Sequence, residues 1–316
     1  MVNLKNGVIE MKATRDAFGD EIVEIGRNNK DVLVVDADIG GSCKTTKFKN
    51  EFPKQHINVG IAEQNAAGLA AGLSTTGKIP FVCTYAVFSL RMAEQIRQEI
   101  CYPKLNVKIA CSHGGLTPAN DGGSHQAIED MGVFRTLPNM TVIMGADYHS
   151  TRKLVKQAAE MYGPVYLRFT RDTIPVIYDE NEEFEIGKAK HLKDGNDVAL
   201  IANGDTVHLA LKAAEVLESE GISVKLLDMH TIKPIDREAI LECIEIEKIV
   251  TVEDHNIING LGSAVSEVVA EQGKGIVRRI GVQDQFGESA PYEKLLELNG
   301  ITVENIVKTA KELIGK

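Results

Sequence analysis

Apolar runs rich in β-branched residues alternate with amphipathic stretches along nearly the whole 316-residue chain. The amphipathic stretches predict helices at 12–28, 62–76, 88–101, 147–161, 206–220, 235–246 and 302–315. The apolar runs predict strands at 31–39, 80–85, 106–112, 140–146, 164–170, 197–204, 223–229, 248–254 and 276–282. Regular strand–helix alternation is typical of parallel sheets covered by helices on both faces. The sequence therefore predicts an α/β fold.

One segment breaks this alternation. Residues 179–197 are acidic and carry two glycines, Gly187 and Gly195, and they fit neither the strand nor the helix pattern. We place a domain boundary there, near residue 185. The sequence thus predicts two doubly wound α/β domains, residues 1–185 and residues 186–316.

Composition excludes several classes of protein. A content of 43% hydrophobic and 25% charged residues fits a globular chain. The formal net charge of −10 argues against nucleic acid or an anionic membrane as a partner. There is no apolar run long enough to span a bilayer and no signal-peptide core. The five cysteines form no C-x-x-C pair and suit reduced thiols. We expect a cytoplasmic protein.

Polar side chains follow several of the predicted strands. Open parallel sheets bind ligands at the carboxyl ends of their strands, so these positions indicate where a site could lie. In the first domain they are Asp36, Asp38, Thr84, Tyr85, Ser112, His113, Thr170 and Arg171. In the second they are Asn203, Asp205, Asp228, His230 and 253–255. On polarity alone, either domain could carry a site.

Residues 111–130 form the most suggestive segment of the first domain. They set His113, Asp121 and His125 among glycines directly after a strand, which is typical of a functional loop. The two histidines lie twelve residues apart with no third ligand, so a metal site is not predicted. By itself Glu63 is an ordinary acidic residue in the first turn of a helix.

Seven segments, taken in order and spacing, resemble the C-terminal half of transketolase. They are ATRDAFG (13–19), DADIGGS (36–42), IAEQN (61–65), TYAVFSLRMAEQIR (84–97), SHGGLTPANDGGSHQAIED (112–130), RFTR (168–171) and TVEDH with NGLGSAVSE (251–267). The likeness runs from near residue 12 to the C-terminus. It implies a thiamine-diphosphate pyrimidine-binding domain followed by the transketolase C-terminal domain.

The resemblance also implies residues that hold thiamine diphosphate. Glu63 matches the glutamate that hydrogen-bonds N1′ of the aminopyrimidine, where a carboxyl stabilises the imino tautomer that activates the cofactor. Phe88 matches the aromatic residue that stacks on this ring, and Tyr85 lines the same pocket. Asp38 matches a position near the thiazolium. His125 matches a position beside the reacting carbonyl, so Glu63 and His125 are the expected catalytic residues.

For the substrate, the resemblance implies a phosphate site and a hydroxyl contact. Arg15, Ser42, His113 and Arg171 match positions that hold a sugar phosphate, and such donors suit a dianion. Asp121 matches a residue that accepts from a sugar hydroxyl. No residue of this chain is expected to bind a metal.

The chain departs from the transketolase pattern at one point. The family anchors diphosphate and Mg²⁺ through a G-D-G motif on an N-terminal domain, and G-D-G is absent from this sequence. Either a separate N-terminal subunit supplies it, or the chain is a fragment of a longer one. The native-looking start at Met1 favours the first of these readings. Because the family builds its sites at shared interfaces, we expect two copies of each subunit, an α2β2 assembly.

The resemblance implies transfer of a two-carbon ketol unit from a ketose phosphate to an aldose phosphate. One alternative is a subunit of an enzyme like 1-deoxyxylulose-5-phosphate synthase, against which His113 in SHGG (112–115) argues. The other is a non-catalytic regulatory subunit that keeps the fold. The presence of Glu63, Phe88, Asp121 and His125 together argues against this second alternative.

Overall fold

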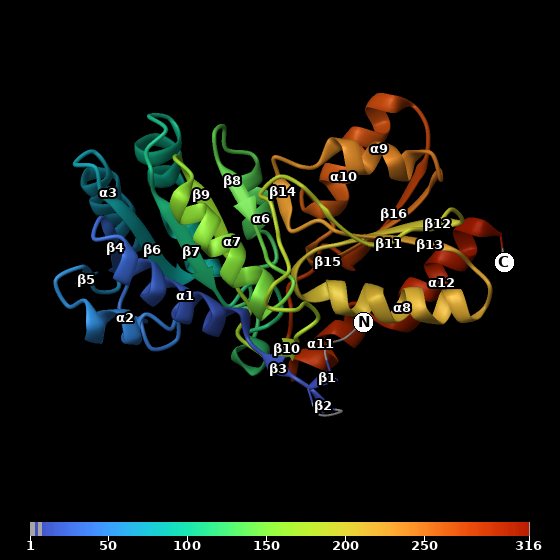
Figure 1. Cartoon of the computed structure of the whole chain (residues 1–316), viewed down its shortest axis with the longest axis horizontal. Coiled ribbons are helices and arrows are strands. Elements are labelled where there is room, and N and C mark those ends of the chain that lie inside the picture. Colours follow the sequence, from blue (N-terminus) through green and yellow to red (C-terminus); the bar gives the residue numbers. More distant parts are fainter. Residues whose placement is uncertain (1–3, 6–7, 316) are drawn as a thin grey trace.

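The computed structural model describes residues 4–5 and 8–315. Residues 1–3, 6–7 and 316, at the ends of the two predicted domains, lie outside the described residues. Two sheets, each with helices on both faces, lie side by side along the long axis of the molecule (Figure 1). Each strand and helix region predicted above contains an element of the predicted type, and the predicted α/β class is confirmed.

The first sheet has the strand order β14-β8-β9-β7-β6-β4-β5. Its strands are β4 Val32–Asp36, β5 His56–Asn58, β6 Ile79–Tyr85, β7 Lys108–Ser112, β8 Thr141–Ile143, β9 Val165–Arg168 and β14 Thr231–Lys233. Neighbouring strands pair in parallel except β14, which is antiparallel to β8. The parallel strands β4, β6, β7 and β9 therefore end at one common edge.

Helices cover both faces of this sheet because alternate strand residues point to opposite sides. Val34 and Phe81 pack with α1 (Thr14–Asn28) and α7 (Tyr148–Glu160). Val35 and Val82, one residue further along each strand, pack with α3 (Glu63–Ser74) and α6 (Asp130–Arg135). Helix α2 (Thr46–Glu51) packs against α1.

The helix predicted over 88–101 is not a single α-helix. It consists of α4 (Ala86–Ser89), the 3₁₀ turn η1 (Leu90–Met92), α5 (Ala93–Gln95) and the π-helical η2 (Ile96–Cys101). Its fully buried side chains Met92, Ile96 and Ile100 recur every four residues. That period exceeds the 3.6 residues of an α-helical turn, and the wider π-helical turn of η2 keeps Ile96 and Ile100 on the buried side of the segment, which packs against α3.

The second sheet has the order β11-β13-β12-β15-β16. Its strands are β11 Lys190–Lys193, β12 Val198–Ala202, β13 Val224–Asp228, β15 Lys248–Asn256 and β16 Ile276–Val282. Helices α9 (Arg237–Ile244) and α10 (Leu261–Gln272) lie above it in Figure 1, and α8 (Val207–Ser219) and α12 (Val303–Ile314) lie below. Helix α11 (Tyr292–Leu298) and the 3₁₀ turn η4 (Gly204–Thr206) complete this half.

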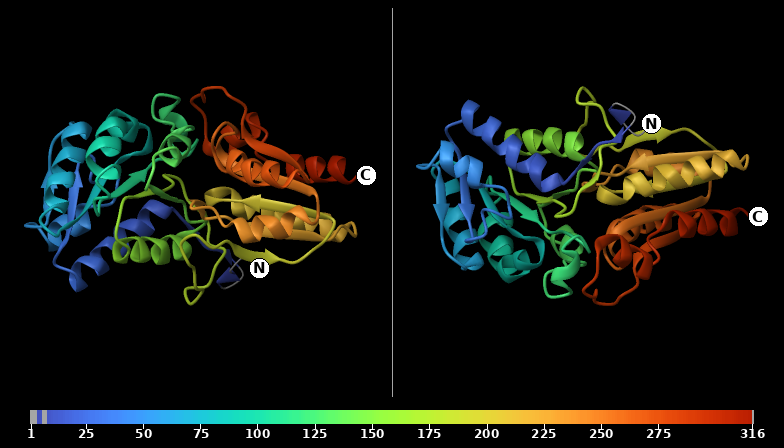
Figure 2. Two further views of the ribbon diagram at one scale, coloured as in Figure 1. Left: turned by 90° about the horizontal axis from the view of Figure 1, so that it is seen from above. Right: turned by 90° about the horizontal axis from the view of Figure 1, so that it is seen from below.

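Several short strands were not predicted. Strands β11 and β14 join their sheets antiparallel, and two small ladders pair β1 (Leu4–Lys5) with β2 (Val8–Ile9) and β3 (Met11–Lys12) with β10 (Ile174–Pro175). Such short segments show no hydrophobic period. The short edge strand β5, by contrast, agrees with a strand that the sequence predicts to end near Gly60, before the helix that begins near Ala62. Strand β14 follows residue 185 yet pairs with β8 in the first sheet (Figure 1), so the C-terminal half adds an edge strand to the N-terminal half, and the two halves adjoin in both views of Figure 2. The domain division at residue 185 stays a prediction.

Within the described residues, no helix is both long enough and apolar enough to cross a membrane.

Candidate active site

The predicted site residues from the strand ends lie at the carboxyl edge of the first sheet. Tyr85 ends β6, His113 follows β7, and Arg171 lies three residues beyond the end of β9. Helix α1 precedes β4, so its first turn lies at the same edge and brings Arg15 there. Reciprocal hydrogen bonds join the backbone N–H and side-chain Oγ1 of Thr14 and Thr170, at 3.0 and 2.7 Å.

Four predicted residues form one aromatic cluster. The Tyr85 ring stacks on Phe88, with centroids 5.4 Å apart and planes at 12°, and on His113, at 3.7 Å and 20°. His125 meets the Tyr85 and Phe88 rings edge-on, at 6.2 and 5.7 Å. The fold thus brings together residues from β6, from α4 and from two positions of one loop. The sequence did not reveal these contacts, because the segments are separated along the chain.

Glu63 is the first residue of α3 and is only 4% exposed. The Nε of Arg91, a residue of η1 with a 65% exposed side chain, donates to Glu63 Oε2 at 3.0 Å. Sequence reasoning missed Arg91. Its position three residues after Phe88 in the 84–97 motif is the signal that could have found it.

A cationic group lies beside the aromatic cluster. Arg15 Nη1 donates to the Ser42 carbonyl at 3.3 Å, and Arg171 Nη1 donates to the Pro118 carbonyl at 3.1 Å. Arg171 Nε lies 3.9 Å from Asp121 Oδ2. The structure therefore places Arg15 next to Ser42 and Arg171 next to Asp121.

His113 connects the cationic group with the aromatic cluster. Burial, together with the positive charges of Arg15 and Arg171 and the nearby His125, lowers the pKa of His113 to about 3. Its Nδ1 shares a 2.8 Å hydrogen bond with Ser112 Oγ. The imidazole is thus neutral near pH 7, and two arginines face the same space. This arrangement suits an anionic group, which would meet charge-assisted donors.

Asp38 makes different contacts from the other predicted residues. Its φ of 68° is a left-handed conformation, and its carboxylate accepts from Asn58 Nδ2 at 2.8 Å. The loop around it is held by Asp36, which accepts from Ile39 N and Thr45 Oγ1. Although burial raises the pKa of Asp36, hydrogen bonds from His56, Thr45 and Ile39 bring it below its ordinary value.

Over residues 4–5 and 8–315, no three His, Cys, Asp or Glu side chains gather in a way that could hold a metal ion.

Two family models together match most of the chain. Residues 10–176 match the transketolase pyrimidine-binding domain, and residues 187–306 match the transketolase C-terminal domain. The chain belongs to the transketolase family. The resemblance that the sequence motifs carry is therefore confirmed.

Relatives of similar length are parts of divided transketolases. The chain is 46% identical to a transketolase C-terminal section of Methanocaldococcus jannaschii, over 96% of this chain and 97% of that one. It is 39% identical to one of the subunits of the apulose-4-phosphate transketolase of Phocaeicola vulgatus, over 97% and 99%. A solved structure titled split gene transketolase, inactive beta4 tetramer, superposes with a TM-score of 0.88 at 47% identity, over 96% and 98%. The chain thus corresponds to the C-terminal subunit of a split transketolase.

Proposed function

We propose that this chain, assembled with an N-terminal transketolase subunit, transfers a two-carbon ketol unit from a ketose phosphate to an aldose phosphate. The observation that carries the proposal is one edge of the first sheet. There the buried Glu63 begins α3, and its carboxylate accepts a hydrogen bond from Arg91, which lies in the same segment as Phe88. The stacked rings of Tyr85 and Phe88 lie beside the cationic group formed by Arg15 and Arg171. The two halves of this edge suit two ligands, a flat basic ring and an anionic sugar.

The chemistry of the donor set fits the aminopyrimidine of thiamine diphosphate. A carboxylate removed from water can hold a ring nitrogen, and flat aromatic side chains can pack on a ring face. When bound, thiamine diphosphate supplies the nucleophile for the donor carbonyl and takes up the electrons of the broken C2–C3 bond. We assign Glu63 to the aminopyrimidine N1′, and Tyr85 and Phe88 to its ring. Asp38 and His125 are assigned to the thiazolium and the reacting carbonyl.

The cationic group fits the phosphate of the sugar. Arg15 and Arg171 supply fixed positive charge, His113 supplies a neutral imidazole, and Ser42 lies beside Arg15. Asp121 is placed to accept from a sugar hydroxyl, since its partner Arg171 would hold the adjacent phosphate. A relative named for apulose-4-phosphate supports a phosphorylated sugar as the substrate class.

The diphosphate and Mg²⁺ are assigned to the partner. This sequence has no G-D-G motif, and a relative built from such chains alone is titled inactive. We therefore propose an α2β2 assembly in the cytoplasm, in which each site takes the pyrimidine contacts from this chain and the diphosphate contacts from the N-terminal subunit.

Reconstitution tests this proposal. The chain is mixed with the N-terminal transketolase subunit from the same source, thiamine diphosphate and Mg²⁺, and ketol transfer between sugar phosphates is measured. Transfer should appear in the mixture and be absent from each chain alone. Transfer by this chain alone, or none by the assembled complex, would overturn the proposal.

Glu63→Ala tests the assignment of the carboxylate. The variant should assemble with the partner and keep its circular dichroism spectrum, but lose turnover by a factor of about 10² or more, because removing an acid–base group commonly costs that much. Glu180→Ala, at an exposed position, is the matched control and should keep full activity. Activity retained by assembled Glu63→Ala would refute the role.

A further inference from the structure

The substrate loop, defined here as residues 112–126, holds several residues in a left-handed backbone conformation. The φ angles are 63° at His113, 61° at Gly115, 56° at Ala119 and 80° at Gly122. For His113 and Ala119 this conformation costs about 1–2 kcal/mol each and persists only when surrounding contacts enforce it. The loop carries His113, Asp121 and His125, so its shape decides where three site residues lie.

The second domain supplies one such contact through Asp254. The Leu116 backbone N–H donates to both carboxylate oxygens of Asp254, at 3.1 and 2.9 Å, and this side chain is 1% exposed. A Cβ on Gly115 would lie 2.1 Å from Asp254 Oδ2, so the backbone of the loop is pressed against the carboxyl group. From Arg168 in the first domain, Nη1 and Nη2 donate to the Asp254 carbonyl.

The same domain contacts the far end of the loop through residues 287–289. Ser289 Oγ donates to the Asn120 carbonyl at 2.6 Å, next to Asp121. Gln126 Nε2 donates to the Glu288 carbonyl at 2.9 Å. A Cβ on Gly123 would lie 2.6 Å from the Gly287 carbonyl oxygen, so these two backbones are also in close contact.

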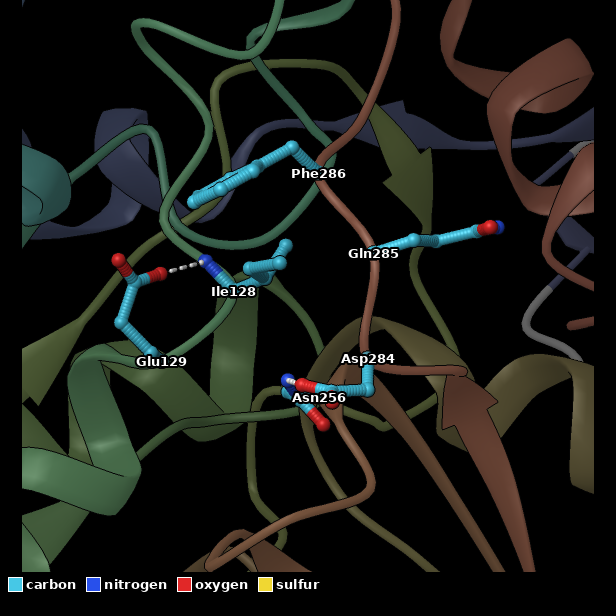
Figure 3. A pocket seen from close by; sticks show the side chains of 6 residues that line it. All are labelled: Ile128, Glu129, Asn256, Asp284, Gln285 and Phe286. Atoms are coloured by element: carbon cyan, nitrogen blue, oxygen red, sulfur yellow. Dashed lines mark hydrogen bonds between the residues drawn. The ribbon is translucent and has the colours of Figure 1, made fainter.

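Figure 3 shows how this part of the second domain lies against the first. The segment Asp284–Phe286 runs past Ile128 and Glu129, just after the substrate loop, and encloses a pocket of about 220 Å³ with Asn256. None of the predicted site residues lines this pocket. The C-terminal segment thus contacts the first domain on both sides of His125.

We propose that the C-terminal domain positions the substrate loop, through Asp254 at its start and residues 287–289 at its end, so that His113 and Asp121 meet the sugar phosphate. The inference rests on the proposed function and gives the second domain a part in it. Arg171 is held by the same loop, because Thr117 Oγ1 accepts from its N–H and the Pro118 carbonyl accepts from its guanidinium. Asp254 is a positioning residue, since it acts on the substrate through this loop.

Three variants of adjacent residues test Asp254. Asp254→Ala removes the acceptor of Leu116 N–H, and Asp254→Asn keeps an acceptor oxygen of the same shape. Burial and the neighbouring Asp205 raise the pKa of Asp254 well above its ordinary value, so a neutral amide is a close mimic. The matched control is Glu253→Ala. Glu253 is equally buried but accepts from Leu261 and Gly262 N–H within its own domain.

The first readout is amide hydrogen exchange in the full-length chain without partner or cofactor. Asp254→Ala should speed exchange of the peptide spanning 112–122 roughly tenfold or more, because a buried donor loses its acceptor. Asp254→Asn should restore slow exchange. Glu253→Ala should speed exchange in α10 and leave the exchange of the substrate loop unchanged. Unchanged exchange of the loop in Asp254→Ala would overturn the proposal, whether or not the chain is a transketolase subunit.

The second readout is the kinetics of the reconstituted enzyme. Asp254→Ala should raise KM for the sugar phosphates roughly tenfold while the concentration of thiamine diphosphate giving half-maximal activity stays unchanged. A parallel loss of cofactor affinity, or no change in KM, would overturn the positioning role. Absence of ketol transfer in the wild-type complex would instead count against the proposed function, and the exchange result would still decide on the loop.

Ser289→Ala provides a variant with little risk to folding, because Ser289 is exposed. It removes one hydrogen bond to Asn120 and should speed exchange of residues 119–126 by a few-fold. If Asp254→Ala fails to fold, Ser289→Ala alone tests the proposal, and unchanged exchange of residues 119–126 in this variant would overturn it.

Discussion

Replacing Arg168 with methionine tests the buried polar network that joins the two domains. Arg168 is fully buried, and its guanidinium lies among acceptors from both halves of the chain. Nη1 and Nη2 each donate to the Asp254 carbonyl at 3.0 Å, and Nη2 donates to the Ala127 carbonyl at 2.8 Å. Nε lies 3.0 Å from Asp130 Oδ2, and Tyr166 O–H donates to the same oxygen at 2.6 Å.

The size of the effect follows from what the substitution leaves behind. Methionine fills part of the volume but leaves the buried Asp130 carboxylate without its cation, and removing one partner of a buried ion pair costs about 3–5 kcal/mol. Two carbonyls also lose their donors, at about 1 kcal/mol each. The remaining hydrogen bond from Tyr166 offsets part of this. We therefore expect Arg168→Met to lower the free energy of unfolding by about 4 kcal/mol.

Urea unfolding followed by far-UV circular dichroism measures this change, since the chain has no tryptophan for fluorescence. Asp130→Asn, measured alone and combined with Arg168→Met, completes a double-mutant cycle. The two changes should be non-additive by at least about 1.5 kcal/mol, because the asparagine removes the uncompensated charge. A loss below about 1 kcal/mol in Arg168→Met, or additive changes, would refute the reasoning.

Two further predictions concern the site. Because the pKa of His113 is about 3 in the folded chain and near 6.5 when unfolded, the unfolded chain binds the extra proton, and stability falls as pH drops below 6.5. His113→Asn removes this titrating group. In urea unfolding, its free energy of unfolding relative to wild type should therefore rise by about 2–3 kcal/mol between pH 7 and pH 4. The same difference between variant and wild type at both pH values would contradict the prediction. Arg91→Met should lower the free energy of unfolding by about 1–3 kcal/mol, because it leaves the buried Glu63 carboxylate without its cation. In the reconstituted enzyme it should also weaken activation by thiamine diphosphate, and unchanged cofactor dependence would show that Arg91 does not orient Glu63.

Local pattern was enough to predict the main elements. Hydrophobic runs predicted the longer strands of both sheets, because a buried parallel strand needs continuous apolar side chains. The short edge strands β11 and β14 were not predicted, since four and three residues of mixed polarity show no hydrophobic period. The division of the predicted helix over 88–101 into several short helical segments was not predicted either, for a related reason. It depends on how the buried side chains Met92, Ile96 and Ile100 pack in the core, where the segment contacts α3, and these contacts lie outside the segment itself.

For the site too, some features could be read from the sequence and others were set by the tertiary structure. Ordered motifs alone identified the family, and they named Glu63, Phe88 and His113 as candidates. The stacking of Tyr85 between separate segments, the arginine on Glu63 and the low pKa of His113 were decided by the tertiary structure. The contact of Asp254 with Leu116 spans 138 residues and two domains. A sequence determines which side chains exist and which face of an element they occupy, whereas electrostatic and packing energies depend on distances that only the folded chain sets.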